Sequence, residues 1–175
     1  MSEFLEGNSN VLFHILYEFH IFLYTLNYTS KSAEFHNIIL DAQRIHARAV
    51  LDFFRDQKKY KDDIIITDIL DKSVKPDEYI FADSDEIEAI RKIINKTTAH
   101  LTYQSCKEDI YHDNDDLHIR FFVKLVNLIE HFVFHLPDIL NDENKAYLND
   151  TKTQELHASI KNEILITMIK NGNNF

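Results

Sequence analysis

Five charged residues recur every three or four positions in the first third of this 175-residue chain, and their types suit anion binding. Asp41, Arg44, Arg48, Asp52 and Arg55 would fall within an arc of about 80° on one helix. A guanidinium group presents a planar fork of N–H donors that fits phosphate or carboxylate oxygens. The pattern predicts either a cleft in which Arg44 and Arg48 bind an anion, or salt bridges such as Arg48 with Asp52 along a half-exposed edge.

A second polar segment stands later in the chain, at the end of another predicted helix, and reads Asn95-Lys96-Thr97-Thr98-Ala99-His100. An imidazole transfers protons near neutral pH, and Lys96, four residues before His100, would lie on the same helical face. The alternative is that His100 is a cation that stabilises the last carbonyls of its helix. If the two predicted helices pack together, Arg44 or Arg48 would reach this segment.

The second segment resembles the signature region of HEPN domains, in particular the branch related to abortive-infection proteins, where an Arg-Asn pair is followed by a histidine. The resemblance implies a helical bundle that often forms a homodimer, with the motifs of two subunits at a shared cleft. Active members of the family are metal-independent ribonucleases in which the histidine and the arginine act on the ribose 2′-hydroxyl and the scissile phosphate. Some members are toxins that a partner protein neutralises.

This chain departs from the family pattern at two positions. Ile94 stands where the family has its arginine, and Thr102, followed by Tyr103, stands where some members carry a modified tyrosine. Arg91 is a poor substitute for the arginine, because nine residues of helix place it about 180° from His100. The positive charge would have to come from Lys96 or from the earlier arginine stripe.

We therefore expect one composite pocket that joins both segments. Its predicted catalytic residues are His100, Arg48 and Lys96, and its predicted binding residues are Arg44, Asn95, Asp52 and Tyr103. The leading interpretation is a degenerate HEPN-like module that binds a partner protein or a nucleotide-type anion in a prokaryotic defence or stress system. The alternative is a metal-independent ribonuclease that uses His100 with Arg48 or Lys96.

A third interpretation is a metal-binding helical-bundle enzyme. His131, which follows Glu130, and His135 have the i, i+4 spacing at which two imidazoles can bind one metal ion. His46 or His20 could be the third ligand, as in DinB-like proteins. In a chain with 10 histidines such a pair is expected by chance, so the sequence predicts neither a metal nor a cofactor. His46 lies on an apolar face and is predicted to be a neutral core histidine.

Composition narrows the other function classes. The formal net charge of −10 disfavours duplex DNA as a ligand, since affinity for duplexes comes mainly from neutralising phosphates, although a partner protein or RNA remains open. The two glycines stand near opposite ends, which excludes a glycine-rich phosphate loop, and one cysteine excludes a disulfide framework. No apolar run approaches the roughly 20 residues of a membrane span, and no secretory signal is recognisable at the start. We expect a cytoplasmic protein.

The helical periodicity predicts an all-α, HEPN-like bundle of about five helices in a single domain over 1–175. The helices are expected at 11–27, 32–55, 83–101, 115–136 and 151–171, with a charged connecting segment at about 56–83 that holds perhaps one further turn. Pro137 is expected to end the fourth helix. The predicted inward faces of the second and last helices are Phe35, Ile38, Ile39, Ala42, Ile45, Ala49 and Phe53, and Leu156, Ile160, Ile164, Met168 and Ile169.

Overall fold

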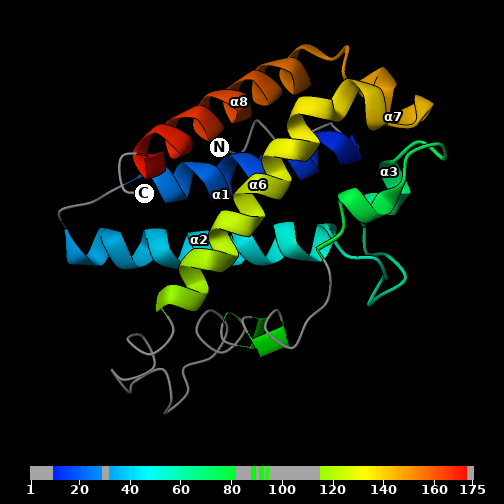
Figure 1. Cartoon of the computed structure of the whole chain (residues 1–175). Helices are drawn as coiled ribbons and strands as arrows, with labels where there is room; N and C mark the ends of the chain where they lie inside the picture. Colours follow the sequence, from blue (N-terminus) through cyan, green and yellow to red (C-terminus); the bar gives the residue numbers. More distant parts are fainter. Residues whose placement is uncertain are drawn as a thin grey trace.

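The computed structural model describes residues 10–28, 32–81, 88, 89, 91, 92, 94 and 115–172. Within them the regular secondary structure is helical, which confirms the predicted all-α class (Figure 1). The elements are α1 (Val11–Asn27), α2 (Ala33–Phe53), α3 (Ile66–Ile69), the short 3-10 helix η2 (Pro76–Glu78), α6 (Asp115–Ile139), α7 (Asp142–Tyr147) and α8 (Thr151–Gly172). Residues 88, 89, 91, 92 and 94, inside the predicted third helix, are helical. No helix in the described ranges is long and apolar enough to span a membrane.

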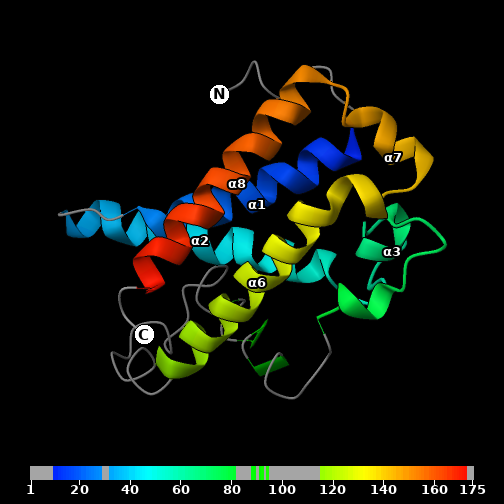
Figure 2. The same ribbon diagram turned by 45° about the horizontal axis from the view of Figure 1, so that its top comes forward.

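Helix α1 is the central element of the bundle. It begins as predicted, because the side-chain oxygen of Asn10 accepts a hydrogen bond from the backbone N–H of Phe13 at 3.2 Å. Its apolar residues are buried on two sides, since α1 packs against α8 on one side and α2 on the other, while α6 crosses α2 (Figure 2). Residues 88–94 contact α2 beside that crossing through Arg91 and Asp52.

An aromatic cluster joins three of these helices. The ring of Phe19 on α1 stacks on Phe54 at 5.4 Å between centroids and meets the ring of Phe132 on α6 edge-on at 5.7 Å. Phe53, at the end of α2, contacts the same Phe132 ring at 5.7 Å. Burial of each such ring contributes roughly 1.5–3 kcal/mol. The cluster fixes the carboxyl-terminal end of α2, which is the end that carries Asp52.

Helix α6 does not end at Pro137 as predicted but continues to Ile139. A proline has no N–H to donate to the carbonyl four residues earlier, so the carbonyl of Val133 needs another donor. His157 of α8 supplies it, with Nε2 at 2.9 Å from the Val133 oxygen. The helix therefore tolerates the proline because a neighbouring helix replaces the missing hydrogen bond.

The connecting segment contains the expected short helical turn, α3, and also η2. It is tied to the end of α6: the N–H of Asp71 donates to the carbonyl of Ile139 at 2.7 Å, and the N–H of Asn141 donates to the carbonyl of Ile69 at 2.9 Å. Helix α7 was not predicted. The start of α8 is capped by Asp150, whose carboxylate accepts from the N–H of Thr153 at 2.9 Å.

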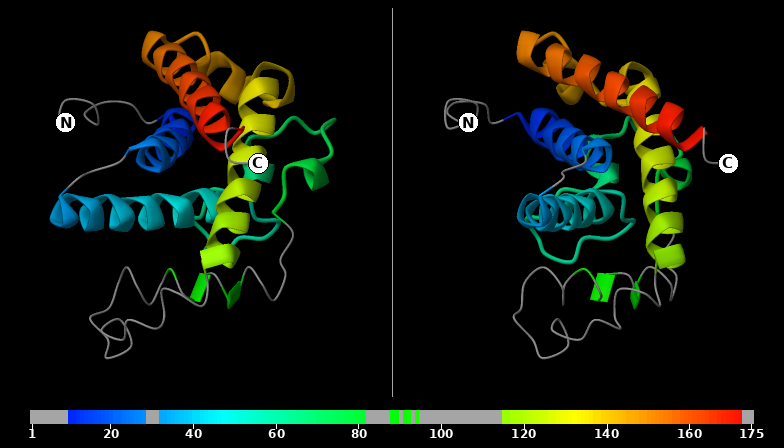
Figure 3. Two further views of the ribbon diagram at one scale, coloured as in Figure 1. Left: turned by 60° about the vertical axis from the view of Figure 1, so that its left-hand side comes forward. Right: turned by 90° about the vertical axis from the view of Figure 1, so that its left-hand side faces the viewer.

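The predicted inward face of α2 is wrong over most of the helix. Phe35 and Ile38 are each 63% exposed and Ile45 is 52% exposed, whereas Ala47, Val50, Leu51 and Phe54 are buried. Phe53 is buried as predicted. Phe35 and Ile38 lie in the amino-terminal half of α2, which extends beyond α1 (Figure 3). Met168 and Ile169, at the end of α8, are also exposed and not buried as predicted.

Candidate functional site

One carboxylate on α2 lies among three guanidinium groups. Asp52 is 3.7 Å from Nε of Arg48, 3.5 Å from Nη1 of Arg55 and 3.6 Å from Nε of Arg91. All three distances are longer than the 2.7–2.9 Å typical of a close charge-assisted hydrogen bond. The carboxylate is thus shared by three cations and is not committed to one of them.

A fourth arginine stands one turn earlier on the same face. Arg44 Nη1 lies 3.2 Å from the carboxylate of Asp41, and Arg91 has a second acidic neighbour in Glu88, also at 3.2 Å. Four of the five arginines of the chain are therefore gathered on or against α2: Arg44, Arg48, Arg55 and Arg91, here called the arginine cluster.

The arginine cluster is a local positive site on an acidic protein. Among the described residues, its four cations lie beside three carboxylates, Asp41, Asp52 and Glu88, in a chain of net charge −10. The side chains of Arg91 and Arg55 are 9% and 18% exposed, so their charges are partly removed from water and need a counter-charge. The side chain of Arg48 is 46% exposed and can be reached from solvent.

The structure places the predicted site residues of α2 together and leaves the others open. Arg44, Arg48 and Asp52 lie on one helical face, and the expected salt bridge between Arg48 and Asp52 is present. The predicted site residues of the second segment, Asn95, Lys96, His100 and Tyr103, lie outside the described residues, so their place in a composite pocket stays a prediction.

Sequence reasoning missed two members of the site. Arg55 was recognised on the stripe but not as a site residue, and Arg91 was considered only as a substitute for the family arginine. The structure brings Nε of Arg91 to 3.6 Å from the carboxylate of Asp52. The sequence does hold a signal for Arg91, because Arg91 lies one helical turn before Ile94, which is buried in the core at 3% exposure. At the position of the family arginine the chain thus has a packing residue.

His46 is not the core histidine that the sequence predicted. Its ring is half-buried between α1 and α2, and Nδ1 lies 2.7 Å from the carboxylate of Glu18. Tyr17 meets the same ring edge-on at 6.5 Å between centroids. His46 therefore ties the first two helices together through a polar contact.

His131 and His135 form a surface pair on α6. The rings of His131 and His135 lie 4.5 Å apart, and Nδ1 of His135 is hydrogen-bonded to the carbonyl of His131 at 2.7 Å. His131 also stacks on Tyr79 at 4.8 Å, with Glu78 3.9 Å from its Nε2. In the part of the chain that the structure describes, no three histidine, cysteine or carboxylate side chains are grouped so that they could hold a metal ion.

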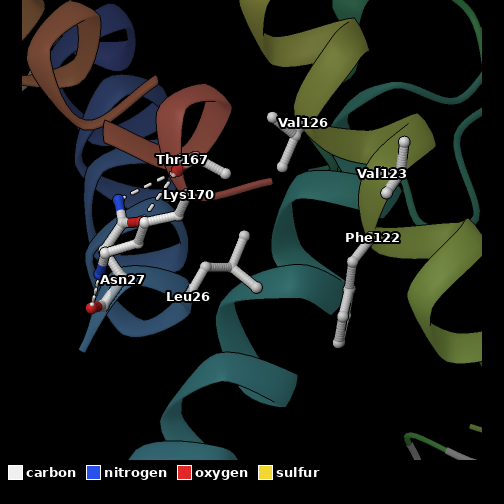
Figure 4. A pocket seen from close by; sticks show the side chains of 7 residues that line it. All are labelled: Leu26, Asn27, Phe122, Val123, Val126, Thr167 and Lys170. Atoms are coloured by element: carbon white, nitrogen blue, oxygen red, sulfur yellow. Dashed lines mark hydrogen bonds between the residues drawn. The ribbon is translucent and has the colours of Figure 1, made fainter. Parts of the chain in front are cut away.

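A cavity of about 190 Å³ opens between α1, α6 and α8 (Figure 4). Its polar side is a network between the ends of α1 and α8: Asn27 donates to the carboxylate of Glu163 at 2.8 Å and to the hydroxyl of Thr167 at 3.0 Å, and Lys170 donates to the carbonyl of Asn27. Leu26, Phe122, Val123 and Val126 form the apolar side. Because its polar groups hold the two helices together, we regard this cavity as structural.

Comparison of the chain with models of known protein families, with curated proteins and with solved structures finds no match. The resemblance to HEPN domains therefore rests only on the short polar segment at residues 95–100 of the sequence. The geometry of the arginine cluster is the firmer basis for a functional argument.

Proposed function

We propose that this protein is a helical binding module whose arginine cluster takes an anionic ligand of the nucleotide type. The observation that carries the proposal is the sharing of Asp52 by Arg48, Arg55 and Arg91 at 3.5–3.7 Å. Each guanidinium has five N–H donors, and a carboxylate has two oxygens with about four acceptor sites. Asp52 alone offers fewer acceptor sites than the donors of Arg48 and Arg55, and a phosphate would add three acceptor oxygens.

The charge and the shape of a phosphate suit the cluster. A terminal phosphate carries a charge near −2 at neutral pH and three acceptor oxygens, and a guanidinium binds two of them in a bidentate manner. Two arginines of the cluster are mostly buried, which strengthens their attraction for an anion relative to a fully solvated pair. Arg48 is the exposed member through which a ligand would enter.

We assign the module to the HEPN-like domains of prokaryotic defence or stress systems as part of the same proposal. Two observations support a degenerate member. Ile94 is a buried core residue at the position of the family arginine, and Arg91, one turn before it, contacts Asp52 and so lies beside the stripe that includes Arg48. The contact between Arg91 and Asp52 also favours the second candidate function, a ribonuclease in which Arg48 acts with His100. It does so because Arg91 belongs to the same predicted helix as His100, and Asp52 belongs to the same stripe as Arg48.

Isothermal titration with inorganic phosphate and with a nucleoside monophosphate tests the proposal. Wild-type protein should bind both, and the Arg48→Ala and Arg55→Ala variants should each bind at least about tenfold more weakly, since a hydrogen bond to a charged group contributes about 1.5–3 kcal/mol. Lys145→Ala, which removes a cation from α7, is the matched control and should leave the affinity unchanged. No heat of binding to wild-type protein would refute the proposal.

Incubation with total RNA in the presence of a chelator separates the two candidates. A binding module leaves the RNA intact. Cleavage that is lost in both His100→Ala and Arg48→Ala would establish the ribonuclease instead.

A further inference from the structure

An exposed apolar stripe runs along α2 beside the arginine cluster. Phe35, Ile38 and Ile45 are 63%, 63% and 52% exposed, and Ala42 and Ala49 lie between and after them, half-buried. These five residues are here called the α2 stripe. Side chains of this size are rarely left in water in a continuous row, because each exposed apolar group forgoes about 25 cal/mol for every Å² that it could bury.

The spacing of the α2 stripe indicates a helix as its partner. Its residues follow one another at intervals of three, four, three and four, which is the seven-residue repeat of a coiled-coil seam. The stripe starts in the part of α2 that extends beyond α1 (Figure 3). A seam of two repeats is also narrow, as expected for contact with one helix.

The sizes of the side chains favour a second copy of α2 that runs in the opposite direction. With a two-fold axis beside residues 43 and 44, Ile45 of one copy faces Ala42 of the other, and Ile38 faces Ala49. These two kinds of layer each combine one large and one small side chain, whereas Phe35 faces Asp52 of the other copy at the edge of the seam. A parallel pair would place Ala42 against Ala42 and Ile38 against Ile38, which alternates gaps with crowding.

The charges beside the α2 stripe are self-complementary in the same antiparallel arrangement. Asp41 directly precedes Ala42, and Arg48 directly precedes Ala49. In an antiparallel pair, these flanking positions of the two helices lie side by side. Asp41 of one copy then lies beside Arg48 of the other, twice across the two-fold axis. Their side chains are 57% and 46% exposed, whereas Arg44 is 15% exposed.

We infer that the α2 stripe is the site at which a second copy of this chain docks, antiparallel, through Ile38, Ala42, Ile45 and Ala49, with Asp41 and Arg48 paired across the interface. The apolar contacts that drive this interface lie outside the arginine cluster, but Arg48 belongs to both, so Ile45→Asp is the variant that separates dimer formation from anion binding. An interface of this kind is isologous, since the same surface serves both copies.

Sedimentation equilibrium of the full chain is the first test. Wild-type protein should have the mass of two chains, and Ile45→Asp should have the mass of one chain, because a carboxylate in the seam cannot be solvated. Leu165→Asp is the matched control: Leu165 is 52% exposed on α8, away from the stripe, and its replacement should leave the dimer intact. Circular dichroism of each variant checks that it is folded.

Charge reversal is the second and more specific test. Asp41→Arg places two arginines together, and Arg48→Asp places two aspartates together, so each single variant should raise the dimer dissociation constant about tenfold or more. The double variant restores opposite charges only across the antiparallel interface, and its dissociation constant should return to within about threefold of wild type. Neither intrachain pair, Asp41 with Arg44 or Arg48 with Asp52, is restored by the double variant.

Three results would overturn the inference. They are a monomeric wild-type protein, a dimer that persists in Ile45→Asp, and a double charge reversal that is at least as weak as the single variants. If wild-type protein is monomeric and Ile45→Asp lowers its melting temperature, the stripe is covered by the chain itself. Loss of the dimer with intact phosphate binding, or the reverse, distinguishes this inference from the proposed function.

Discussion

At the scale of the residue, Asp52 is the side chain that balances the arginine cluster. It supplies a shared counter-charge to Arg48, Arg55 and Arg91, and its own side chain is 40% exposed. In the absence of a ligand it neutralises cations that are partly removed from water. A bound phosphate would perform the same task, so Asp52 and the ligand compete for the same donors.

The Asp52→Asn variant separates these two roles. We expect it to bind phosphate roughly three- to tenfold more tightly, because a competing negative charge is gone. We expect it to be less stable by about 1–3 kcal/mol in urea denaturation, since Arg91, at 9% exposure, loses an acidic neighbour. Asp41→Asn is the control and should cost less than about 1 kcal/mol, because its carboxylate is 57% exposed. Weaker phosphate binding in Asp52→Asn would mean that the aspartate positions the arginines and does not compete with the ligand.

At the scale of the element, the sequence predicts where the long helices lie better than which way they face. The bounds of α1 follow from the cap at Asn10 and an almost continuous apolar run. Helix α2 has two apolar stripes, one through Ile38 and Ile45 and one through Leu51 and Phe54, and nothing in its periodicity says which of them meets the core. The aromatic contacts of Phe54 with Phe19 and Phe132 decide it, and they depend on helices distant in sequence.

The proline in α6 shows a second limit of local prediction. A proline at position 137 is expected to end a helix, but the donor that rescues the helix, His157, comes from α8. No local pattern around Pro137 contains that information. The same holds for the arginine cluster, where Arg91 reaches Asp52 from a segment that follows a long connection.

A double-mutant cycle measures the link between Pro137 and His157. His157→Phe should destabilise the protein by about 1–2 kcal/mol, because the carbonyl of Val133 loses its donor. In a Pro137→Ala background the same change should cost clearly less, since the alanine N–H can donate to that carbonyl. Equal costs in both backgrounds, measured by urea denaturation, would show that the hydrogen bond contributes nothing.

At the scale of the whole molecule, two half-buried histidines make stability depend on pH. Burial lowers the pKa of His20 below its ordinary value of 6.5, against the opposing charge of Glu163, and burial likewise lowers the pKa of His157. The folded state therefore binds fewer protons than the unfolded state in this range. The contribution of these two histidines to the free energy of unfolding is therefore fully present above pH 6.5. It is lost as the pH falls through 6.5 towards their lower pKa values in the folded state.

We expect the free energy of unfolding to fall between pH 7.5 and pH 5 by less in His20→Gln than in wild type, because glutamine takes up no proton. Urea denaturation at both pH values measures the difference, and comparison with wild type cancels the contribution of the carboxylates. Leu165→Gln, on the exposed surface of α8, removes no titratable group, and as the control it should keep the wild-type dependence. An unchanged dependence in His20→Gln would contradict the effect of burial on this histidine.

The arginine side chains themselves give the most direct test of the account. The chain has only five arginines, so their Nε–Hε signals can be assigned in a heteronuclear NMR spectrum by single substitutions. On titration with a nucleoside monophosphate, the signals of Arg48, Arg55 and Arg91 should shift together and saturate at one affinity. Unchanged signals of these three arginines at saturating ligand would contradict the proposal that the arginine cluster binds the anion.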